Sequence, residues 1–277
     1  MTDLTYSFEF FPPKSEKSAQ ELLSSVEELS RFSPKFMTVT FGTGGGSRDT
    51  TLQTLKNLQR AANGIPFGSH LTYISHTKEE LDHYTDILWN QGIRHLVALR
   101  GDMPTNLVWP LDPDAEYYQF TSDFVEALLK RHPFDISVGA YPEKHPDAPD
   151  MQADLIALKK KCDAGATRAI TQLFFDNDVY YRFVDAAQKA GIATPIVPGL
   201  LPIRDFQKVC EFASKCQASV PQFLHEKFAG DISDNLAEDL LSAQVEDLAK
   251  NGVDHIHFYT LNKSSVLNAV CKNFSKN

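Results

Sequence analysis

The segment Leu155–Phe175, with the sequence LIALKKKCDAGATRAITQLFF, contains one repeat of the architecture that we expect for the whole chain. Its first half places apolar residues three and four positions apart, on one face of a helix. Gly165 follows at a position where a glycine typically ends a helix. The run Ala169–Phe175 then has the length and the apolar composition of a buried strand in a parallel sheet.

The same alternation of an apolar run and an amphipathic stretch recurs along the chain. The other expected strands are Ser7–Phe11, Phe36–Phe41, Gly68–Ile74, His95–Leu99, Ile136–Tyr141, Ile196–Leu201 and His255–Tyr259. Two patterns, Ser18-x-x-Glu21 and Thr77-x-x-Glu80, predict capping boxes at the starts of helices.

Eight strands that alternate with helices predict a closed (β/α)8 barrel, the TIM barrel, forming a single domain over residues 1–277. The alternative is an open doubly wound sheet, which would need a G-x-G-x-x-G motif after the first strand, and the sequence lacks it. The glycine-rich run Gly42–Ser47 follows the second strand instead. It is either a flexible loop that enters the next helix or the edge of a substrate or cofactor site.

The composition argues against several classes of function. A net charge of -9 leaves no basic face for nucleic acid, although a few local cations could still hold an anionic cofactor. The chain lacks an apolar run long enough to span a membrane, and its start does not resemble a signal peptide. Its four cysteines form no C-x-x-C pair, which indicates reduced thiols. We therefore expect a cytoplasmic protein that binds neither nucleic acid nor a membrane.

Polar residues at the carboxyl ends of the strands are the candidates for function in such a barrel. Glu9 lies inside the aromatic stretch Phe8–Phe11. Because an ionised carboxylate is costly to bury, burial would raise the pKa of Glu9 and make it a proton donor near neutral pH. The alternative is that Glu9 faces outward and pairs with a lysine of a helix.

The fourth expected strand ends in Arg100, Gly101 and Asp102. Gly101 permits a sharp exit from the strand, so that the two charged residues remain at the rim. Arg100 could hold a diphosphate or a carbonyl group, and Asp102 could stabilise a cation or bind the edge of an aminopyrimidine. The alternative is an ion pair between these two residues at the surface.

Two further strand ends carry polar groups. Gln172 shares a face of its strand with Ile170 and Phe174, where a buried amide needs partners, either a bound heterocycle or a hydrogen bond across the barrel. Tyr141 and His145 follow the fifth strand and could pack against an adenine or a ribose, or belong to an ordinary loop that prolines stiffen. His255 and His257 alternate on the last strand, but no convergent carboxylate or cysteine set is evident, so a structural role is favoured over a metal site.

Seven motifs of the chain occur in the order in which one known family carries them. They are SFEFFPPK (Ser7–Lys14), VTFG (Val39–Gly42), HLT (His70–Thr72), ALRGD (Ala98–Asp102), AYPE (Ala140–Glu143), DAGATRAITQLFF (Asp163–Phe175) and FYTLN (Phe258–Asn262). On these motifs the chain closely resembles the bacterial 5,10-methylenetetrahydrofolate reductases, from Ser7 to about Asn262.

The resemblance implies a barrel that binds FAD without a covalent bond and is usually a homo-oligomer. NADH or NADPH would reduce the flavin and leave, and methylenetetrahydrofolate would then enter the same space and be reduced to 5-methyltetrahydrofolate. By motif position Glu9 would be the general acid for opening of the folate ring. Asp102 would hold the pterin, stabilise the cationic iminium and alter the reactivity of the flavin, and Gln172 would bind the pterin and the nicotinamide. The FAD-binding positions of the family fall on Thr40, His70, Arg100, Gly101, Asp102, Tyr141, His145, Asp154, Lys160 and Lys161.

Several positions depart from the pattern of the family. Lys263 stands where we expect an arginine, and Lys208 stands where a relative has a folate-contacting glutamine; both keep or add positive charge near the glutamate tail of the substrate. Lys160 often corresponds to an arginine, so a bidentate contact would become a point charge. The loop Thr105–Tyr118 looks longer than usual, and its contacts are therefore not carried over.

Two other functions remain as alternatives. A flavin barrel that oxidises proline would need a pair of arginines on the last helix, and Val266–Cys271 offers none. A flavin- or folate-binding protein without catalysis is the second alternative, which the presence of both Glu9 and Asp102 disfavours.

Overall fold

The computed structural model describes residues 4–41, 48–62, 64–103, 116–230 and 233–274. The strands are β1 (Thr5–Phe10), β2 (Phe36–Val39), β3 (Phe67–Thr72), β4 (His95–Leu99), β5 (Asp135–Ala140), β6 (Arg168–Thr171), β7 (Ile196–Val197), β8 (Gly199–Leu200) and β9 (His255–Tyr259). The helices are α1 (Glu16–Ser30), α2 (Arg48–Ala61), α3 (Lys78–Asn90), α4 (Thr121–Arg131), α5 (Met151–Asp163), α6 (Asn177–Lys189), α7 (Phe206–Cys216), α8 (Gln222–Ala229), α9 (Leu236–Lys250) and α10 (Ser265–Phe274).

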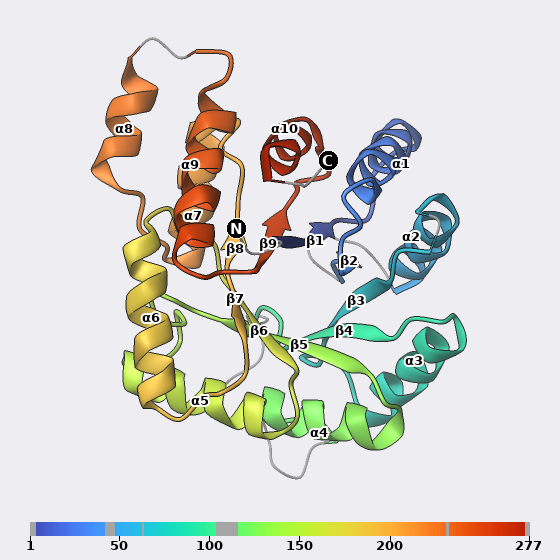
Figure 1. Cartoon of the computed structure of the whole chain (residues 1–277). Helices are drawn as coiled ribbons and strands as arrows, with labels where there is room; N and C mark the ends of the chain where they lie inside the picture. Colours follow the sequence, from blue (N-terminus) through green and yellow to red (C-terminus); the bar gives the residue numbers. More distant parts are fainter. Residues whose placement is uncertain (1–3, 42–47, 63, 104–115, 231–232, 275–277) are drawn as a thin grey trace.

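The strands form one parallel sheet in the order β7-β6-β5-β4-β3-β2-β1-β9-β8, with the helices around it (Figure 1). The two edge strands, β7 and β8, are consecutive in the chain and are separated only by Pro198. The sheet therefore curls until its two edges meet, which confirms the predicted (β/α)8 barrel. The seventh predicted strand, Ile196–Leu201, is split in two because Pro198 has no N–H to donate to a neighbouring strand.

The seam between β7 and β8 is bridged by Thr171, at the end of β6. The backbone N–H of Gly199 donates to Thr171 Oγ1 at 2.8 Å, and the Tyr259 hydroxyl donates to the Thr171 carbonyl at 2.6 Å. A Cβ atom on Gly199 would lie 2.3 Å from that carbonyl oxygen and 2.7 Å from the Tyr259 ring. Only glycine therefore fits at position 199 of the barrel.

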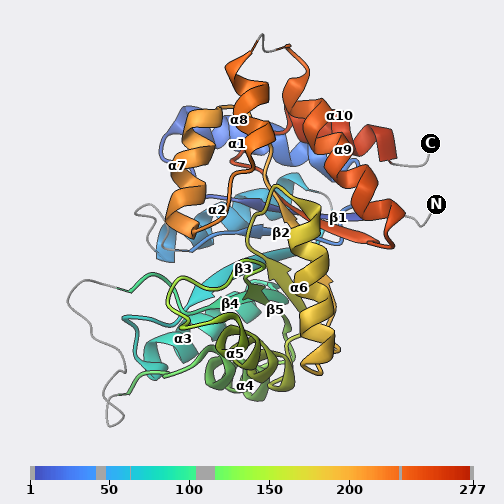
Figure 2. The same ribbon diagram turned by 90° about the vertical axis from the view of Figure 1, so that its left-hand side faces the viewer.

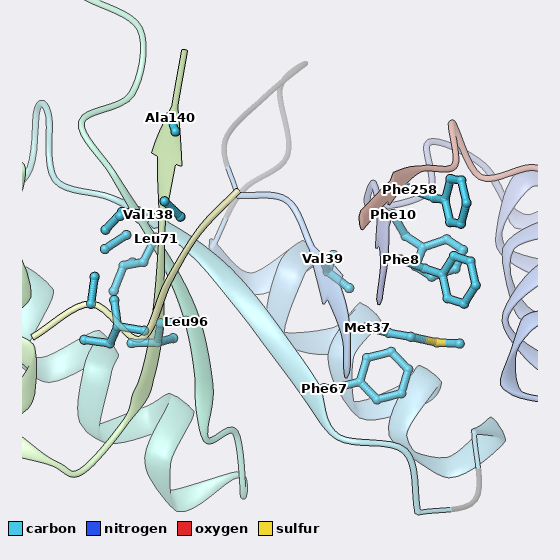
Figure 3. Close-up of a cluster of buried hydrophobic side chains, with 14 of the residues drawn as sticks. Phe8, Phe10, Met37, Val39, Phe67, Leu71, Leu96, Val138, Ala140 and Phe258 are labelled. Carbon is cyan, nitrogen blue, oxygen red and sulfur yellow. The ribbon is translucent and has the colours of Figure 1, made fainter. Parts of the chain in front are cut away.

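The hydrophobic core lies between the strands and the helices. Phe8 and Phe10 of β1 and Phe258 of β9 are fully buried on the side of the strands that faces a helix (Figure 3). Burial of each such ring contributes about 1.5–3 kcal/mol. Because side chains alternate along a strand, Ser7 and Glu9 of β1 point the other way, into the barrel. The interior of the barrel thus holds polar residues beside a small apolar cluster of Phe36, Ile170 and Val197.

The helix ends test the predicted capping motifs. Thr77 and Glu80 form the expected capping box at the start of α3. The box predicted at Ser18 is wrong, because α1 begins three residues earlier with Ser15 as its N-cap and Ser18 as the second member of the box. A serine can serve at either end of a capping box, so the motif did not fix the helix start.

The carboxyl ends of several predicted strands are shorter in the structure. The run Ala169–Phe175 contains a strand only as far as Thr171, so that Gln172 lies just beyond β6. Gly42–Ser47 and most of Thr105–Tyr118 lie outside the described residues. Figure 2 shows the helices on both sides of the barrel; among those that the structure describes, none is both long and apolar enough to cross a membrane.

Candidate active site

Two adjoining cavities lie at the carboxyl ends of β4 and β5, with volumes of about 410 and 650 Å³. Such volumes are typical of sites for small molecules. Among the predicted residues, the smaller cavity is lined by Arg100, Gly101, Asp102, Tyr141, His145, Lys161 and Gln172. The larger is lined by Arg100, His145, Asp154, Lys160 and Lys161. Of these predicted residues, Arg100, His145 and Lys161 line both cavities, together with Met103, Thr121 and Asp147.

The sharp exit from β4 separates Arg100 from Asp102. An NH2 group of Arg100 lies 2.6 Å from Asp147 Oδ2, so the alternative of an ion pair with Asp102 is wrong. Asp102 is exposed in the smaller cavity. Gly101 has a φ of +92°, and a Cβ there would lie 2.8 Å from a methyl group of Ile74. The turn that aims the two charges apart therefore requires glycine.

The loop after β5 holds Tyr141 and His145 together. Their ring centres are 4.5 Å apart, with the planes close to perpendicular. The backbone N–H of His145 donates to the carboxylate of the buried Asp154 at 2.9 Å. Burial raises the pKa of Tyr141 to about 12 and lowers the pKa of His145 below its ordinary value. Both rings are thus neutral near pH 7, as suits stacking against a ligand.

Lys160 and Lys161 lie side by side in the last turn of α5 and line the larger cavity. Lys161 donates to the Gly139 carbonyl at 2.6 Å, and burial lowers the pKa of its ammonium group. The ammonium nitrogen of Lys160 lies 5.9 Å from the centre of the Phe120 ring. With Arg100, these groups provide cations for an anionic ligand such as a diphosphate.

Gln172 differs from its prediction in both burial and bonding. It is only partly buried, and its side-chain oxygen accepts a hydrogen bond from the N–H of Leu173 at 2.9 Å. The predicted alternative, a hydrogen bond across the barrel, is therefore not what holds this oxygen. The NH2 group is the part of the side chain that can bind a ligand in the smaller cavity.

Glu9 points into the barrel and lies between two histidines. Its Oε2 atom is 3.3 Å from His70 Nε2 and 3.6 Å from His257 Nε2, with 12% of the side chain exposed. The inward orientation excludes the alternative of a surface pair with a helix lysine. The predicted raised pKa is corrected: burial raises the pKa of Glu9, but the interactions with His70 and His257 outweigh burial and lower the pKa.

Thr40 and His70 lie at the ends of β2 and β3. Thr40 Oγ1 is buried and has no hydrogen-bond partner among the residues that the structure describes. A buried hydroxyl without a partner costs about 1–3 kcal/mol, so this atom fits a position that a ligand completes. His70 was expected only at the cofactor, yet its Nε2 also lies 3.3 Å from Thr38 Oγ1 and beside Glu9.

Lys208 and Lys263 are not among the residues that line the two cavities. Lys208 lies in the first turn of α7 and pairs with Asp205 at 2.7 Å. Lys263 follows β9 and pairs with Glu21 of α1 at 2.8 Å. Both ammonium groups are half exposed or more, so they are held by neighbours on the surface.

Sequence reasoning missed the role of His257. Its Nδ1 lies 2.8 Å from Ser7 Oγ, and the same oxygen lies 3.0 Å from His255 Nε2. Glu9 lies beside His257, although no group of three or more His, Cys, Asp or Glu side chains that could hold a metal ion is found among the described residues. The alternating patterns of Ser7 with Glu9 and of His255 with His257 carry this signal, but only once β1 and β9 are known to pair in register.

The sequence matches known proteins over nearly the whole chain. Residues 1–275 match the family model described as Methylenetetrahydrofolate reductase. The chain belongs to the methylenetetrahydrofolate reductase family. This family match disfavours the alternative that the chain is a flavin-binding barrel that oxidises proline.

Individual relatives agree with the family match. The 5,10-methylenetetrahydrofolate reductase of Escherichia coli is 42% identical over 273 residues, which are 97% of this chain and 90% of that protein. The enzyme of the same name from Buchnera aphidicola subsp. Acyrthosiphon pisum is 39% identical, over 96% of this chain and 90% of its own length. Methylenetetrahydrofolate reductase (NADH) 1 of Arabidopsis thaliana is 32% identical, over 93% of this chain and 46% of that protein.

Proposed function

We propose that the chain reduces 5,10-methylenetetrahydrofolate to 5-methyltetrahydrofolate with NADH or NADPH as reductant and FAD as bound cofactor. The observation that carries the proposal is the pair of cavities that share Arg100, His145 and Lys161. A ligand with a diphosphate at its centre and a ring system at each end matches two spaces joined at cations. The carboxylate of Asp102 and the amide of Gln172 line the space for the reacting rings.

The residues present fit FAD. Arg100, Lys160 and Lys161 would hold its diphosphate, and the rings of Tyr141 and His145 would pack against its ribose or adenine. The buried Thr40 hydroxyl would gain the partner that it otherwise lacks. When bound, FAD supplies a ring that accepts a hydride from the nicotinamide and passes it to the folate.

Glu9 is the group that we assign to proton transfer. The five-membered ring of the folate must open before it accepts a hydride, and opening requires a proton on the departing nitrogen. Glu9 rests ionised because its pKa is lowered. Glu9 lines neither of the two cavities. A substrate that extends over Glu9 would exclude water from the carboxylate, and this added desolvation would raise its pKa. Protonated Glu9 is then matched to its task as a general acid.

Asp102 and Gln172 would act on the reacting part of the folate. The exposed carboxylate of Asp102 can accept hydrogen bonds from the aminopyrimidine edge of a pterin, and its negative charge stabilises a cationic iminium. The NH2 group of Gln172 can donate to the same heterocycle or to the nicotinamide. Lys208 and Lys263 would attract the carboxylates of the glutamate tail from outside the two cavities. A homo-oligomer and a cytoplasmic location, with which the four free cysteines agree, complete the proposal.

The test is to purify the chain, release its cofactor by heat and identify the cofactor chromatographically. FAD is expected, and the loaded enzyme should form 5-methyltetrahydrofolate from methylenetetrahydrofolate in the presence of NADH or NADPH. Release of FMN would contradict the roles given to Lys160 and Lys161, because FMN lacks the adenosine monophosphate half. A loaded enzyme that forms no 5-methyltetrahydrofolate with either nucleotide would contradict the reaction itself.

A further inference from the structure

A line of polar side chains runs through the interior of the barrel from Glu9 to its amino-terminal end. His257 Nε2 lies 3.6 Å from Glu9 Oε2, too far for a hydrogen bond, and has no hydrogen-bond partner among the described residues. His257 Nδ1 lies 2.8 Å from Ser7 Oγ. On the other side of this hydroxyl, His255 Nε2 lies 3.0 Å from the same oxygen. His255 is the first residue of β9, so the line spans the strand from one end to the other.

The register of β1 and β9 creates this line. The two strands are parallel, with Ser7 opposite His257 and Glu9 opposite Tyr259. Alternate residues of both strands point inward, which stacks the hydroxyl, the carboxylate and the two imidazoles in one column. Ser7 and His257 are fully buried, whereas His255 keeps 5% of its surface exposed. Of Ser7, His257 and His255, only His255 has exposed surface.

The hydrogen atoms of this column can be arranged in two directions, since a neutral imidazole has one donor and one acceptor and a hydroxyl can be both. With Glu9 ionised, His257 Nε2–H points toward Glu9 across 3.6 Å, Ser7 donates to His257 Nδ1, and His255 Nε2–H donates to Ser7. With Glu9 protonated, the direction reverses: Glu9 donates to His257 Nε2, His257 Nδ1–H donates to Ser7, and Ser7 donates to His255 Nε2. Both histidines are neutral in both arrangements.

We propose that Ser7, His257 and His255 relay a proton to Glu9 from the amino-terminal end of the barrel. The proposal rests on the role of Glu9 as general acid. As Glu9 loads, His257 Nε2–H passes its proton to the carboxylate and the Ser7 hydroxyl proton passes to His257 Nδ1. The His255 Nε2 proton passes to Ser7, and one proton from a solvent acid binds His255 Nδ1. Glu9 then gives its proton to the folate nitrogen, so one proton enters the column and one leaves on the product. Before the next turnover, the two imidazoles and the hydroxyl return to the first arrangement by rotation.

Such a relay meets a need that the bound substrate creates. Glu9 rests ionised, and a substrate that extends over it would separate it from the solvent at the carboxyl end of the barrel. A proton that arrives after the substrate must then come through the protein. Burial, with the charge of Lys35 and its neighbours, lowers the pKa of His255 to about 2. His255 is therefore neutral at rest, as both arrangements require.

Other groups lie close to the column. His70 of β3 and Tyr259 of β9 also face Glu9, and Phe36 of β2 stacks on His257. His95 of β4 is the other histidine near this ring, but it is engaged by Asp135, Ser137 and Arg168. Because His95 shares the burial of the column without its connection to Glu9, it provides a matched control.

The kinetic test uses single-turnover reduction of methylenetetrahydrofolate by the prereduced holoenzyme in mixtures of H2O and D2O. In the wild type, transfer of several protons together should give a curved dependence on the D2O fraction. Ser7→Ala should slow this half-reaction at least about tenfold and make the dependence linear, with the substrate dissociation constant and the reduction by NADH unchanged. His257→Gln should do the same, and His95→Gln should keep the wild-type rate and curvature.

A Glu9→Gln variant distinguishes the failure of the relay from the failure of the proposed function. If folate reduction is slow in Glu9→Gln but keeps the wild-type rate and curvature in Ser7→Ala and His257→Gln, then Glu9 is the general acid and the proposed relay is wrong. If Glu9→Gln itself is unimpaired, the assignment of the acid is wrong. Equal loss in both half-reactions of Ser7→Ala would indicate a structural role and overturn the relay.

A second measurement keeps the test independent of turnover and of the folding of the variants. In the wild-type holoenzyme labelled with 15N-histidine, the imidazole nitrogen shifts report which ring nitrogen carries the proton. Titration of Glu9 should switch His257 and His255 together between their two neutral forms, while His95 keeps its form. Independent behaviour of His255 and His257 would overturn the proposal.

Discussion

Both ends of the barrel carry polar and charged side chains, but the two ends differ in whether other residues of the protein bind these side chains. At the amino-terminal end, Asp135 Oδ2 lies 2.8 Å from an NH2 group of Arg168 and 3.0 Å from His95 Nδ1. Asp135 also accepts a hydrogen bond from Thr167. At the carboxyl end, Asp102 is exposed in a cavity and the Thr40 hydroxyl lacks a partner within the described residues. At the amino-terminal end the protein itself binds its charged groups, so that end is structural. At the carboxyl end polar groups remain available for a ligand, so that end is functional.

The largest expected effect belongs to the carboxyl end. Glu9→Gln keeps the size of the side chain and removes its transferable proton, so folate reduction should fall by the roughly 10²–10⁴-fold that general acid catalysis supplies. Reduction of the loaded enzyme by NADH needs no such proton and should stay within about tenfold of wild type. Stopped-flow measurement of the two half-reactions checks this. Parallel loss in both, with lost cofactor, would place Glu9 with the structural residues instead.

The amino-terminal end should control how stability depends on pH. Burial lowers the pKa of His95 to about 4 from an unfolded value near 6.5. Below pH 6.5 His95 binds a proton in the unfolded chain, whereas in the folded protein it binds one only near pH 4. The free energy of unfolding therefore falls as the pH drops from 6.5 to 4. His95 alone would contribute about 3 kcal/mol to that loss. Urea unfolding at a series of pH values measures it, and His95→Gln should flatten the curve.

Removal of the cation at the amino-terminal end should reduce stability and spare catalysis. Arg168→Met leaves Asp135 and His95 without the guanidinium that bridges them, which should cost about 1–3 kcal/mol of unfolding free energy, since Asp135 is partly exposed. Folate reduction per folded molecule should match wild type. Chemical denaturation and a turnover assay on the same sample decide the outcome. A catalytic defect at full stability would contradict the division between the two ends.

The smallest effect is expected at the outer rim of the carboxyl end. Lys263→Ala removes one cation from the region of the glutamate tail, and since exposed charges contribute about 0–1 kcal/mol, KM for the folate should rise by up to about fivefold with kcat unchanged. The matched control is Glu21→Gln, which frees Lys263 from its ion pair and should not raise KM. A fall in kcat with KM unchanged would refute the role in binding the tail.

The sequence was sufficient for the barrel because the strands and helices are local features. The period of the apolar residues, the glycine after α5 and the box at Thr77 are each read within a few residues. The position of Gln172 beyond β6 was not predicted, because its run of apolar residues continues past the point where the backbone leaves the sheet.

The partners of the candidate residues depend on contacts between distant segments. Glu9 and His257 are 248 positions apart, and their contact follows from the pairing of the first strand with the last. The direction of the pKa shift of Glu9 was wrong for this reason: burial could be read from its aromatic neighbours, but the two histidines that outweigh burial could not. Arg100 and Asp147 likewise meet through a loop whose course the sequence does not reveal.

Hydrogen exchange should begin at the interruption by Pro198. There β7 and β8 each pair with one neighbour through only two residues. Few backbone hydrogen bonds need to break for the ring to part at this place, so local opening should occur here at lower free energy than elsewhere among the strands. The protein would then transiently populate an open sheet in which the helices remain folded. Hydrogen exchange at the amide of Gly199 would measure how often this opening occurs.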